Sequence, residues 1–208
     1  MKKFSEELFA QTPIVGILRG YDKETVLEIA RTFVSEGFTN LEITKNSPNV
    51  FEIIEALVDE FQGKLNIGCG TVLTKKDTKK ALKAGASFIV TPIVNKDVIR
   101  FCAKMEIPVF PGAFSPTEIY TAWKLGAKMV KVFPSANLGP SYIKNVAAPL
   151  DFIDFMPTGG VSLENIDEFK KAGAKAFGMG GLLFDSEMIE RKDWHSLALH
   201  FRKFKEAL

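Results

Sequence analysis

Residues 84–92 read Ala84-Gly85-Ala86-Ser87-Phe88-Ile89-Val90-Thr91-Pro92, in which a short apolar run follows a glycine and ends at a proline. Glycine is favoured just past the end of a helix, because that position needs a positive φ. The β-branched and aromatic residues after it favour a strand, and proline cannot donate to a strand ladder. The stretch therefore predicts a helix end, one whole strand and the start of a loop.

Similar junctions recur every 19 to 26 residues, at positions 37, 63, 85, 107, 126, 150 and 173. Between them, apolar residues spaced three and four apart predict helices, as over residues 25–35, 51–61 and 163–171. The apolar runs predict eight strands, over residues 13–19, 40–44, 65–69, 87–91, 107–110, 128–133, 152–156 and 175–179. Four of these strands are expected to end at a proline, namely Pro92, Pro111, Pro134 and Pro157.

Eight alternations of strand and helix predict an α/β protein with a parallel sheet closed into a (β/α)8 TIM barrel. An open doubly wound sheet is the competing architecture. It would normally carry Gly-x-Gly-x-x-Gly after its first strand, and residues 19–22, Arg-Gly-Tyr-Asp, do not fit that motif. We expect one domain over residues 1–208, with a short N-terminal helix over residues 3–10 and a long C-terminal helix.

Composition narrows the functional classes. With 46% hydrophobic residues and 18 phenylalanines, the chain has enough apolar surface for a core, which excludes disorder. Its 27 Lys and Arg nearly balance 25 Asp and Glu, so no strong field attracts nucleic acid or an anionic membrane. Two cysteines form no disulfide framework. No apolar stretch suits a signal peptide or a membrane span, so we expect a cytoplasmic protein.

Two charged residues interrupt strands that should be apolar on both faces. Lys131 lies between Val130 and Val132, and Glu42 lies between Leu41 and Ile43. If the apolar neighbours face the helices, the two-residue period of a strand turns Lys131 and Glu42 into the barrel.

A buried structural ion pair is one interpretation, although such pairs repay their desolvation poorly. The alternative is catalysis. Burial lowers the pKa of a lysine, which favours the neutral amine that attacks a carbonyl, and active sites of this fold lie at the carboxyl ends of the strands. We favour Schiff-base chemistry, with Lys131 as the nucleophile and Glu42 as the proton shuttle.

Glycine pairs follow the last two predicted strands. One stands in Thr158-Gly159-Gly160, before a helix expected to start at Ser162, and the other in Gly178-Met179-Gly180-Gly181. Tight turns alone would explain them, but these two loops often hold a phosphate in TIM barrels. Arg19 and Thr71 also follow strands, and Arg19 suits either a carboxylate or phosphate clamp or an exposed loop. His195 and His200 are five residues apart without an acidic cluster, so we expect no metal site.

The motifs, in this order and spacing, resemble the class I aldolases that cleave 2-keto-3-deoxy-6-phosphogluconate, with the related 4-hydroxy-2-oxoglutarate activity. The resemblance extends from Ile14 to Leu183. It is carried by the segments Gly16-Ile17-Leu18-Arg19, Leu41-Glu42-Ile43-Thr44, Gly68-Cys69-Gly70-Thr71-Val72-Leu73, Ile89-Val90-Thr91-Pro92, Lys131-Val132-Phe133-Pro134 and Pro157-Thr158-Gly159-Gly160-Val161.

The resemblance implies roles for individual residues. Lys131 would be the Schiff-base lysine and Glu42 the general acid and base, as the pattern itself suggests. Thr71 and the main chain near Pro92 would seat the pyruvate end of the substrate. Arg19 and Thr158 would contact the remainder, and Gly159 and Gly160 would receive the phosphate. The resemblance also implies a homotrimer of barrels that acts on a phosphorylated keto acid without metal or organic cofactor.

Two positions depart from the phosphogluconate pattern. Asn46, preceded by Lys45, stands where that group usually has an arginine, and Gly181 stands where it often has a serine. Asn46-Ser47-Pro48, residues 133–135 and residues 139–144 look more like the aldolases for 2-keto-3-deoxy-6-phosphogalactonate, whereas Thr158 is typical of the gluconate group. The leading hypothesis is a retro-aldol lyase that yields pyruvate and an aldehyde. A phosphosugar isomerase or epimerase and a non-catalytic phospho-acid-binding barrel are the alternatives.

Overall fold

A computed structural model describes residues 3–208 of the chain. All its strands lie in one parallel sheet with the order β7-β6-β5-β4-β3-β2-β1-β8. The strands are β1 (Ile14–Leu18), β2 (Asn40–Thr44), β3 (Asn66–Gly70), β4 (Phe88–Thr91), β5 (Val109–Ala113), β6 (Val130–Val132), β7 (Phe155–Pro157) and β8 (Phe177–Met179).

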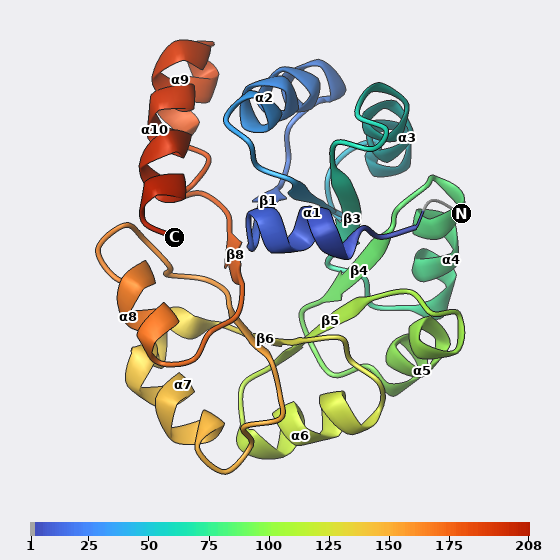
Figure 1. Ribbon diagram of the computed structural model, residues 1–208. Coiled ribbons are helices and arrows are strands. Elements are labelled where there is room, and N and C mark those ends of the chain that lie inside the picture. Colours follow the sequence, from blue (N-terminus) through green and yellow to red (C-terminus); the bar gives the residue numbers. More distant parts are fainter. Residues whose placement is uncertain (1–2) are drawn as a thin grey trace.

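The sheet closes on itself between its two end strands. Isolated parallel bridges join Phe155 to Ala174 and Thr158 to Gly178, so β7 and β8 meet without a long ladder. The helices surround the strands as an outer ring (Figure 1). The predicted (β/α)8 barrel is confirmed.

The helices are α1 (Glu6–Gln11), α2 (Lys23–Ser35), α3 (Val50–Glu60), α4 (Lys75–Lys83), α5 (Lys96–Lys104), α6 (Pro116–Lys124), α7 (Gly139–Ala147), α8 (Ile166–Lys171), α9 (Ser186–Glu190) and α10 (Trp194–Glu206), with a 3-10 turn η1 (Ser135–Asn137). Several begin at a residue whose side-chain oxygen accepts a backbone N–H, among them Ser5, Asp22, Thr74, Asn95 and Ser115. None of the helices in the described part of the chain combines the length and apolar character of a membrane span.

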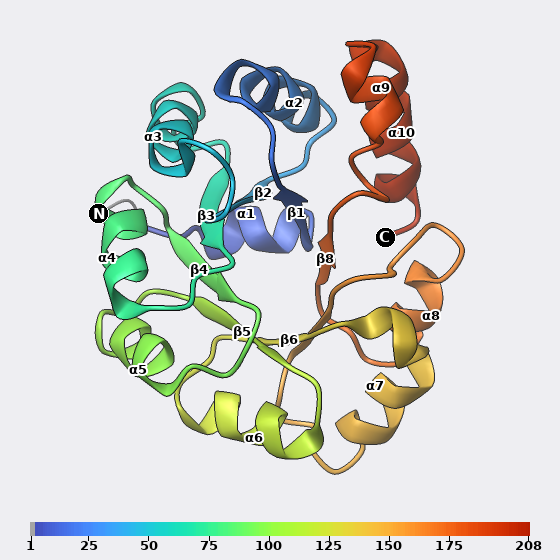
Figure 2. The ribbon, with the colours of Figure 1, turned by 180° about the vertical axis from the view of Figure 1, so that it is seen from behind.

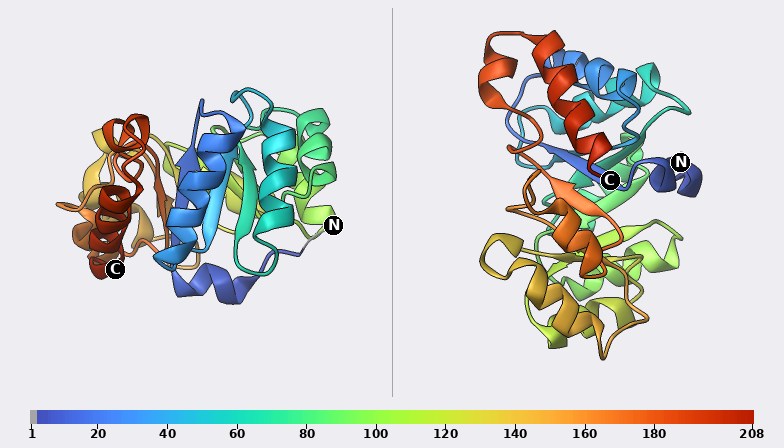
Figure 3. Two further views of the ribbon diagram at one scale, coloured as in Figure 1. Left: turned by 90° about the horizontal axis from the view of Figure 1, so that it is seen from above. Right: turned by 60° about the vertical axis from the view of Figure 1, so that its left-hand side comes forward.

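Helix α1 lies across the end of the barrel where the strands begin (Figure 1, and Figure 3, left). Its Phe9 packs with Phe88 and Phe110 in an apolar cluster inside the barrel, which Val15 and Met156 extend. The opposite end, where the strands finish, faces the viewer in Figure 2 and is not covered by α1. The fold therefore leaves the carboxyl ends of the strands for a site.

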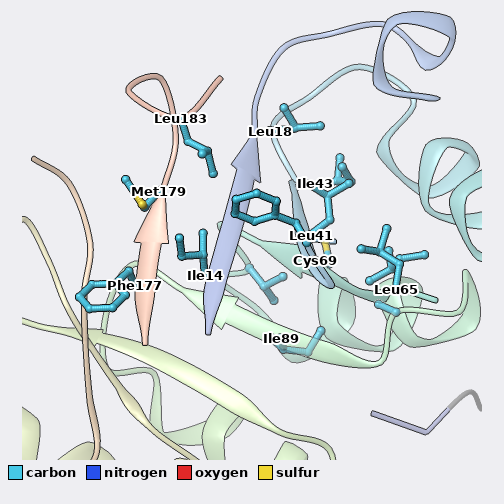
Figure 4. Close-up of a cluster of buried hydrophobic side chains, with 14 of the residues drawn as sticks. Ile14, Leu18, Leu41, Ile43, Leu65, Cys69, Ile89, Phe177, Met179 and Leu183 are labelled. Atoms are coloured by element: carbon cyan, nitrogen blue, oxygen red, sulfur yellow. The ribbon is translucent and has the colours of Figure 1, made fainter. Parts of the chain in front are cut away.

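A second cluster fills the space between the strands and the helix ring. It holds the outward side chains of β1, β2 and β8, including Ile14, Leu18, Leu41, Ile43 and Phe177 (Figure 4). The glutamate of β2 lies between two of these outward residues, so its own side chain faces the barrel interior.

The structure corrects some predicted boundaries. Pro111 does not end a strand, since β5 runs on to Ala113. Pro111 lies opposite Thr91 of β4, and the next residue, Gly112, lies opposite Lys131 of β6. The strand therefore continues past Pro111, which lacks only its own N–H. Helix α8 begins at Ile166, not at the predicted Ser162, because residues 163–165 form a turn first.

Candidate active site

Lys131 is the middle residue of β6 and points into the barrel. Its neighbours Val130 and Val132 belong to the core between strands and helices, which leaves the interior to the lysine. Lys131 is only 7% exposed, and its Nζ lies 5.0 Å from the ring centroid of Phe133. The predicted inward direction is confirmed, and most of the lysine side chain is buried.

Glu42 is the middle residue of β2 and is 1% exposed. Its Oε2 has no hydrogen-bond partner among the described residues, although buried carboxylate oxygens are normally bonded. The carboxyl group occupies space that Gly70 leaves open, because a Cβ at Gly70 would lie 1.5 Å from Glu42 Oε1. An unbonded, buried carboxyl oxygen is unusual as a structural feature and suits a group that exchanges protons.

The surroundings favour the uncharged form of both groups. Burial lowers the pKa of Lys131, and Arg19 acts in the same direction, while Glu42 opposes it. Burial also raises the pKa of Glu42, against the attraction of Lys131 and Arg19. The two side chains are coupled through their charges, yet no hydrogen bond or ion pair between them is present in residues 3–208. Both pKa shifts favour the neutral form, which is the form in which an amine acts as a nucleophile and a carboxyl acts as a general acid.

A cavity of about 560 Å³ lies above Lys131 at the carboxyl ends of the strands. Most of the residues singled out in the sequence line it: Arg19, Thr71, Pro92, Lys131, Thr158, Gly159, Gly160 and Gly181. They come from six different strand ends, so only barrel closure brings them together. One cationic side chain besides the lysine, that of Arg19, belongs to this lining.

Thr71, at the end of β3, has a left-handed backbone with φ of +56°. A β-branched residue rarely adopts this conformation, and such strain clusters at functional sites. The Arg19 guanidinium lies 3.5 Å from its hydroxyl, through Nη2. The two residues thus form a polar edge of the cavity.

The loops after β7 and β8 supply the opposite edge. Gly159 and Gly160 have φ of +83° and +82°, which only glycine adopts without strain. Thr158 is 4% exposed, and Gly178 leaves room for its hydroxyl, since a Cβ there would lie 2.2 Å from Thr158 Oγ1. The expected helix start at Ser162 is absent, so backbone groups of the loops, not a helix terminus, line this edge.

Asn46 is exposed and does not line the cavity. Its neighbour Lys45 points elsewhere, in an ion pair with Asp77 at 3.7 Å between Nζ and Oδ1. The structure therefore does not bring these two residues to Lys131, and Arg19 holds the cationic position at the cavity.

Sequence reasoning missed some contributors. Gly70 makes room for Glu42, and Tyr21 and Phe133 add aromatic surface to the cavity. The signal for Gly70 was available, because a glycine inside a strand often marks a close approach of another group. Tyr21 follows Arg19 in a loop and carried no such signal.

The family model for KDPG and KHG aldolases matches residues 5–199. The chain belongs to the KDPG and KHG aldolase family. This confirms the resemblance and the predicted enzyme class, a carbon–carbon lyase. Within residues 3–208 there is no group of three or more His, Cys, Asp or Glu side chains suited to hold a metal ion.

The curated relatives include both phosphogalactonate and phosphogluconate aldolases. A 2-dehydro-3-deoxy-6-phosphogalactonate aldolase of Escherichia coli is 34% identical over 198 residues, which are 94% of this chain and 96% of the relative. A 2-dehydro-3-deoxy-phosphogluconate aldolase of Pseudomonas aeruginosa is 35% identical over 183 residues, which are 88% of this chain and 81% of the relative. Identity alone does not separate the two groups.

Two solved structures bear on chemistry and assembly. The KDPG aldolase of Legionella pneumophila, with pyruvate captured as a covalent carbinolamine intermediate, is 26% identical with a TM-score of 0.86, covering 94% of this chain and 95% of that one. A designed porous cage, made by fusing symmetric oligomeric domains, contains a chain that is 34% identical with a TM-score of 0.87, covering 95% of this chain and 73% of that one.

Proposed function

We propose that the protein cleaves 2-keto-3-deoxy-6-phosphogluconate to pyruvate and glyceraldehyde 3-phosphate through a Schiff base on Lys131. The observation that carries the proposal is the buried Lys131 side chain in the cavity lining, together with the buried, unbonded carboxyl of Glu42, whose charge acts on the amine. An isomerase or epimerase would not require a lysine at this position.

In the first half of the reaction, the neutral amine of Lys131 attacks the C2 ketone of the substrate. The carbinolamine forms with proton transfer to its oxygen. Glu42, whose pKa is raised by burial, donates the proton that lets this oxygen leave as water. The product is a protonated imine, and Glu42 is left as a carboxylate.

In the second half, Glu42 accepts the proton of the C4 hydroxyl, directly or through water. The C3–C4 bond breaks, the aldehyde departs, and the electron pair moves toward the iminium nitrogen to give an enamine. Glu42 returns the proton to C3, which gives the iminium of pyruvate. Water then hydrolyses this iminium to pyruvate and the neutral amine of Lys131, and the proton released in this step returns to Glu42. The iminium nitrogen is the electron sink, so the reaction as written needs no metal or organic cofactor.

We assign the remaining contacts by position around the cavity. Thr71 and the main chain at Pro92 would hold the pyruvate end, and Arg19 the carboxylate. Thr158 would contact the C4 to C6 portion, and Gly159, Gly160 and Gly181 would receive the phosphate through backbone N–H groups. Asn46 would act only if its exposed loop turned toward a bound substrate.

The galactonate epimer is the second candidate substrate, favoured by the relative in Escherichia coli and by Asn46-Ser47-Pro48. A further candidate is 4-hydroxy-2-oxoglutarate, which would give pyruvate and glyoxylate. Steady-state cleavage of the two phosphorylated epimers and of 4-hydroxy-2-oxoglutarate, measured side by side, ranks the three.

The test of the chemistry is borohydride reduction in the presence of pyruvate, followed by peptide mass mapping. A pyruvyl adduct on Lys131 is expected, and it should vanish in Lys131→Met together with cleavage. Lys128→Ala is the matched control, because Lys128 is 41% exposed in its side chain and pairs with Glu6 at 2.9 Å. An adduct elsewhere, or full turnover in Lys131→Met, would end the proposal.

We also propose a homotrimer in the cytoplasm, in keeping with the family. Support comes from an exposed aromatic surface made of Tyr120, Trp123 and Phe152, which are 41%, 40% and 51% exposed. The Trp123 ring lies 4.7 Å from that of Phe152, so the surface is continuous. Light scattering should give three times the chain mass, and Trp123→Glu should reduce it if this surface is the interface.

A further inference from the structure

The loops after β7 and β8 present backbone N–H groups that have no protein acceptor. Gly159, Gly160, Gly181 and Leu182 line the cavity. Among the hydrogen bonds of residues 3–208, none uses the N–H of these four residues as donor. Neighbouring unbonded amides are good donors to an anion.

These amides depend on outside contacts for their direction. Three of the four residues are glycines, and the side chain of Leu182 is 53% exposed, so none anchors its loop by packing. The base of the second loop is fixed, because Met179 and Leu183 are buried beside β1 (Figure 4). The tip between them is a turn in which the N–H groups of Leu183 and Phe184 donate to the Gly180 carbonyl at 2.8 and 3.0 Å. An anion site on this tip is stronger when its free amides are already held in place, because ordering them on binding costs free energy.

Each loop receives one hydrogen bond from a side chain outside its free amides: Asn165 at the end of the first loop, and His200 of α10 for the second. Asn165 Nδ2 donates to the Gly160 carbonyl at 2.8 Å, while its Oδ1 accepts the Ser162 N–H at 2.9 Å. His200 Nε2 lies 3.0 Å from the Leu182 carbonyl. Because a carbonyl only accepts, His200 Nε2 carries the hydrogen. The tethered carbonyls belong to the same loops as the unbonded amides.

The tether on the second loop is held by a rigid helix. The His200 ring packs edge-on against Phe204, with centroids 5.2 Å apart, and Phe204 is 2% exposed. Phe201, on the same helix α10, meets Phe33 of α2 at 5.3 Å, and the two helices run side by side in Figure 2. Helix α10 thus fixes the imidazole, and the imidazole fixes the loop.

We propose that Asn165 and His200 are positioning residues that hold the loops after β7 and β8 in the conformation that binds the phosphate ester of the substrate. The proposal rests on the proposed function. Neither residue touches the reacting carbons, so both act through the loop amides. Their loss should weaken recognition of the phosphate and leave the chemistry at Lys131 intact.

The test compares three readouts that need different parts of the site. Exchange of the pyruvate methyl protons for deuterium, followed by NMR, needs Lys131 and Glu42 but no phosphate. The KM for cleavage of 2-keto-3-deoxy-6-phosphogluconate depends on both the pyruvate end and the phosphate end of the site. The Kd of inorganic phosphate, measured by calorimetry, depends on the loops alone and requires no turnover.

In Asn165→Asp and His200→Ala, we expect KM and the Kd of inorganic phosphate each to rise about 3- to 10-fold, the usual worth of one hydrogen bond. Pyruvate exchange should stay within about twofold. His200→Gln keeps a donor at the same reach and should bind phosphate like the parent enzyme. His195→Ala is the matched control, because His195 is exposed on the same helix and contacts neither loop.

An unchanged phosphate Kd in folded His200→Ala and Asn165→Asp would overturn the proposal. So would a parallel loss of pyruvate exchange and phosphate binding, since that outcome indicates a general structural role, and so would His200→Gln behaving like His200→Ala. Absence of pyruvate exchange in the parent enzyme would instead refute the proposed function, and phosphate binding would still test the tethers.

Discussion

Gly70→Ala should damage catalysis by displacing a single carboxyl group. A Cβ at this position would lie 1.5 Å from Oε1, 2.2 Å from Cδ and 2.6 Å from Cγ of Glu42. Carbon atoms in contact are about 3.5 Å apart, so the carboxyl must retreat by roughly 2 Å. Gly70 does not have a positive φ, so the substitution adds a steric effect without backbone strain.

The expected magnitude follows from that displacement. A misplacement of about 1 Å in a catalytic arrangement costs about 10²-fold in rate. We therefore expect kcat/KM for cleavage to fall by at least about 10²-fold, equivalent to about 2.7 kcal/mol of transition-state stabilisation. The added methyl group should also cost about 1–3 kcal/mol of stability, as overpacking does in cores.

Pyruvate release, followed through lactate dehydrogenase, measures the loss. Circular dichroism and thermal unfolding establish that the variant is folded. A second substitution separates the proposed cause from general damage. Glu42→Asp shortens the side chain by one methylene group. It should therefore lower kcat/KM much less in the Gly70→Ala background than in the parent enzyme. A folded Gly70→Ala enzyme with kcat/KM within about threefold of the parent would refute the reasoning.

Three further variants test the same site. Glu42→Gln should lower kcat by about 10²- to 10⁴-fold, the usual share of acid–base catalysis. Because the folded pKa of Glu42 is raised above 4.5, the folded protein keeps a proton that the unfolded chain releases, and stability falls as pH rises from 4.5 through the folded pKa. Glu42→Gln lacks this decline, so its advantage in Tm should grow over that range; a constant difference would contradict the assignment. Thr71→Asn should raise the free energy of unfolding by about 1 kcal/mol, because asparagine tolerates a left-handed backbone; unfolding curves measure this gain. The same variant should raise KM because it loses the hydroxyl, and steady-state kinetics measures that effect. Gly181→Ser adds a hydroxyl where nothing lies within 4 Å, and should lower KM for phosphorylated substrates about 3- to 10-fold, but not for 4-hydroxy-2-oxoglutarate.

Local sequence patterns were sufficient for the architecture and for the direction of the charged residues. The glycine junctions and apolar runs predicted eight strands, because helix ends and strand composition depend on residues that are neighbours in the chain. The two-residue strand period was enough to place Lys131 and Glu42 inside the barrel. The boundaries were less well predicted at Pro111 and Ser162, where pairing partners and a preceding turn, not local propensity, set the element ends.

Other features exist only through contacts between distant segments. The room that Gly70 leaves for Glu42 depends on how β2 and β3 pack, and the exposed position of Asn46 depends on where its loop leaves the barrel. The tether from His200 to Leu182 spans 18 residues and two helices. Periodicity determines which way a side chain faces, whereas its distance from another strand or loop is determined by barrel closure, which no short stretch of sequence encodes.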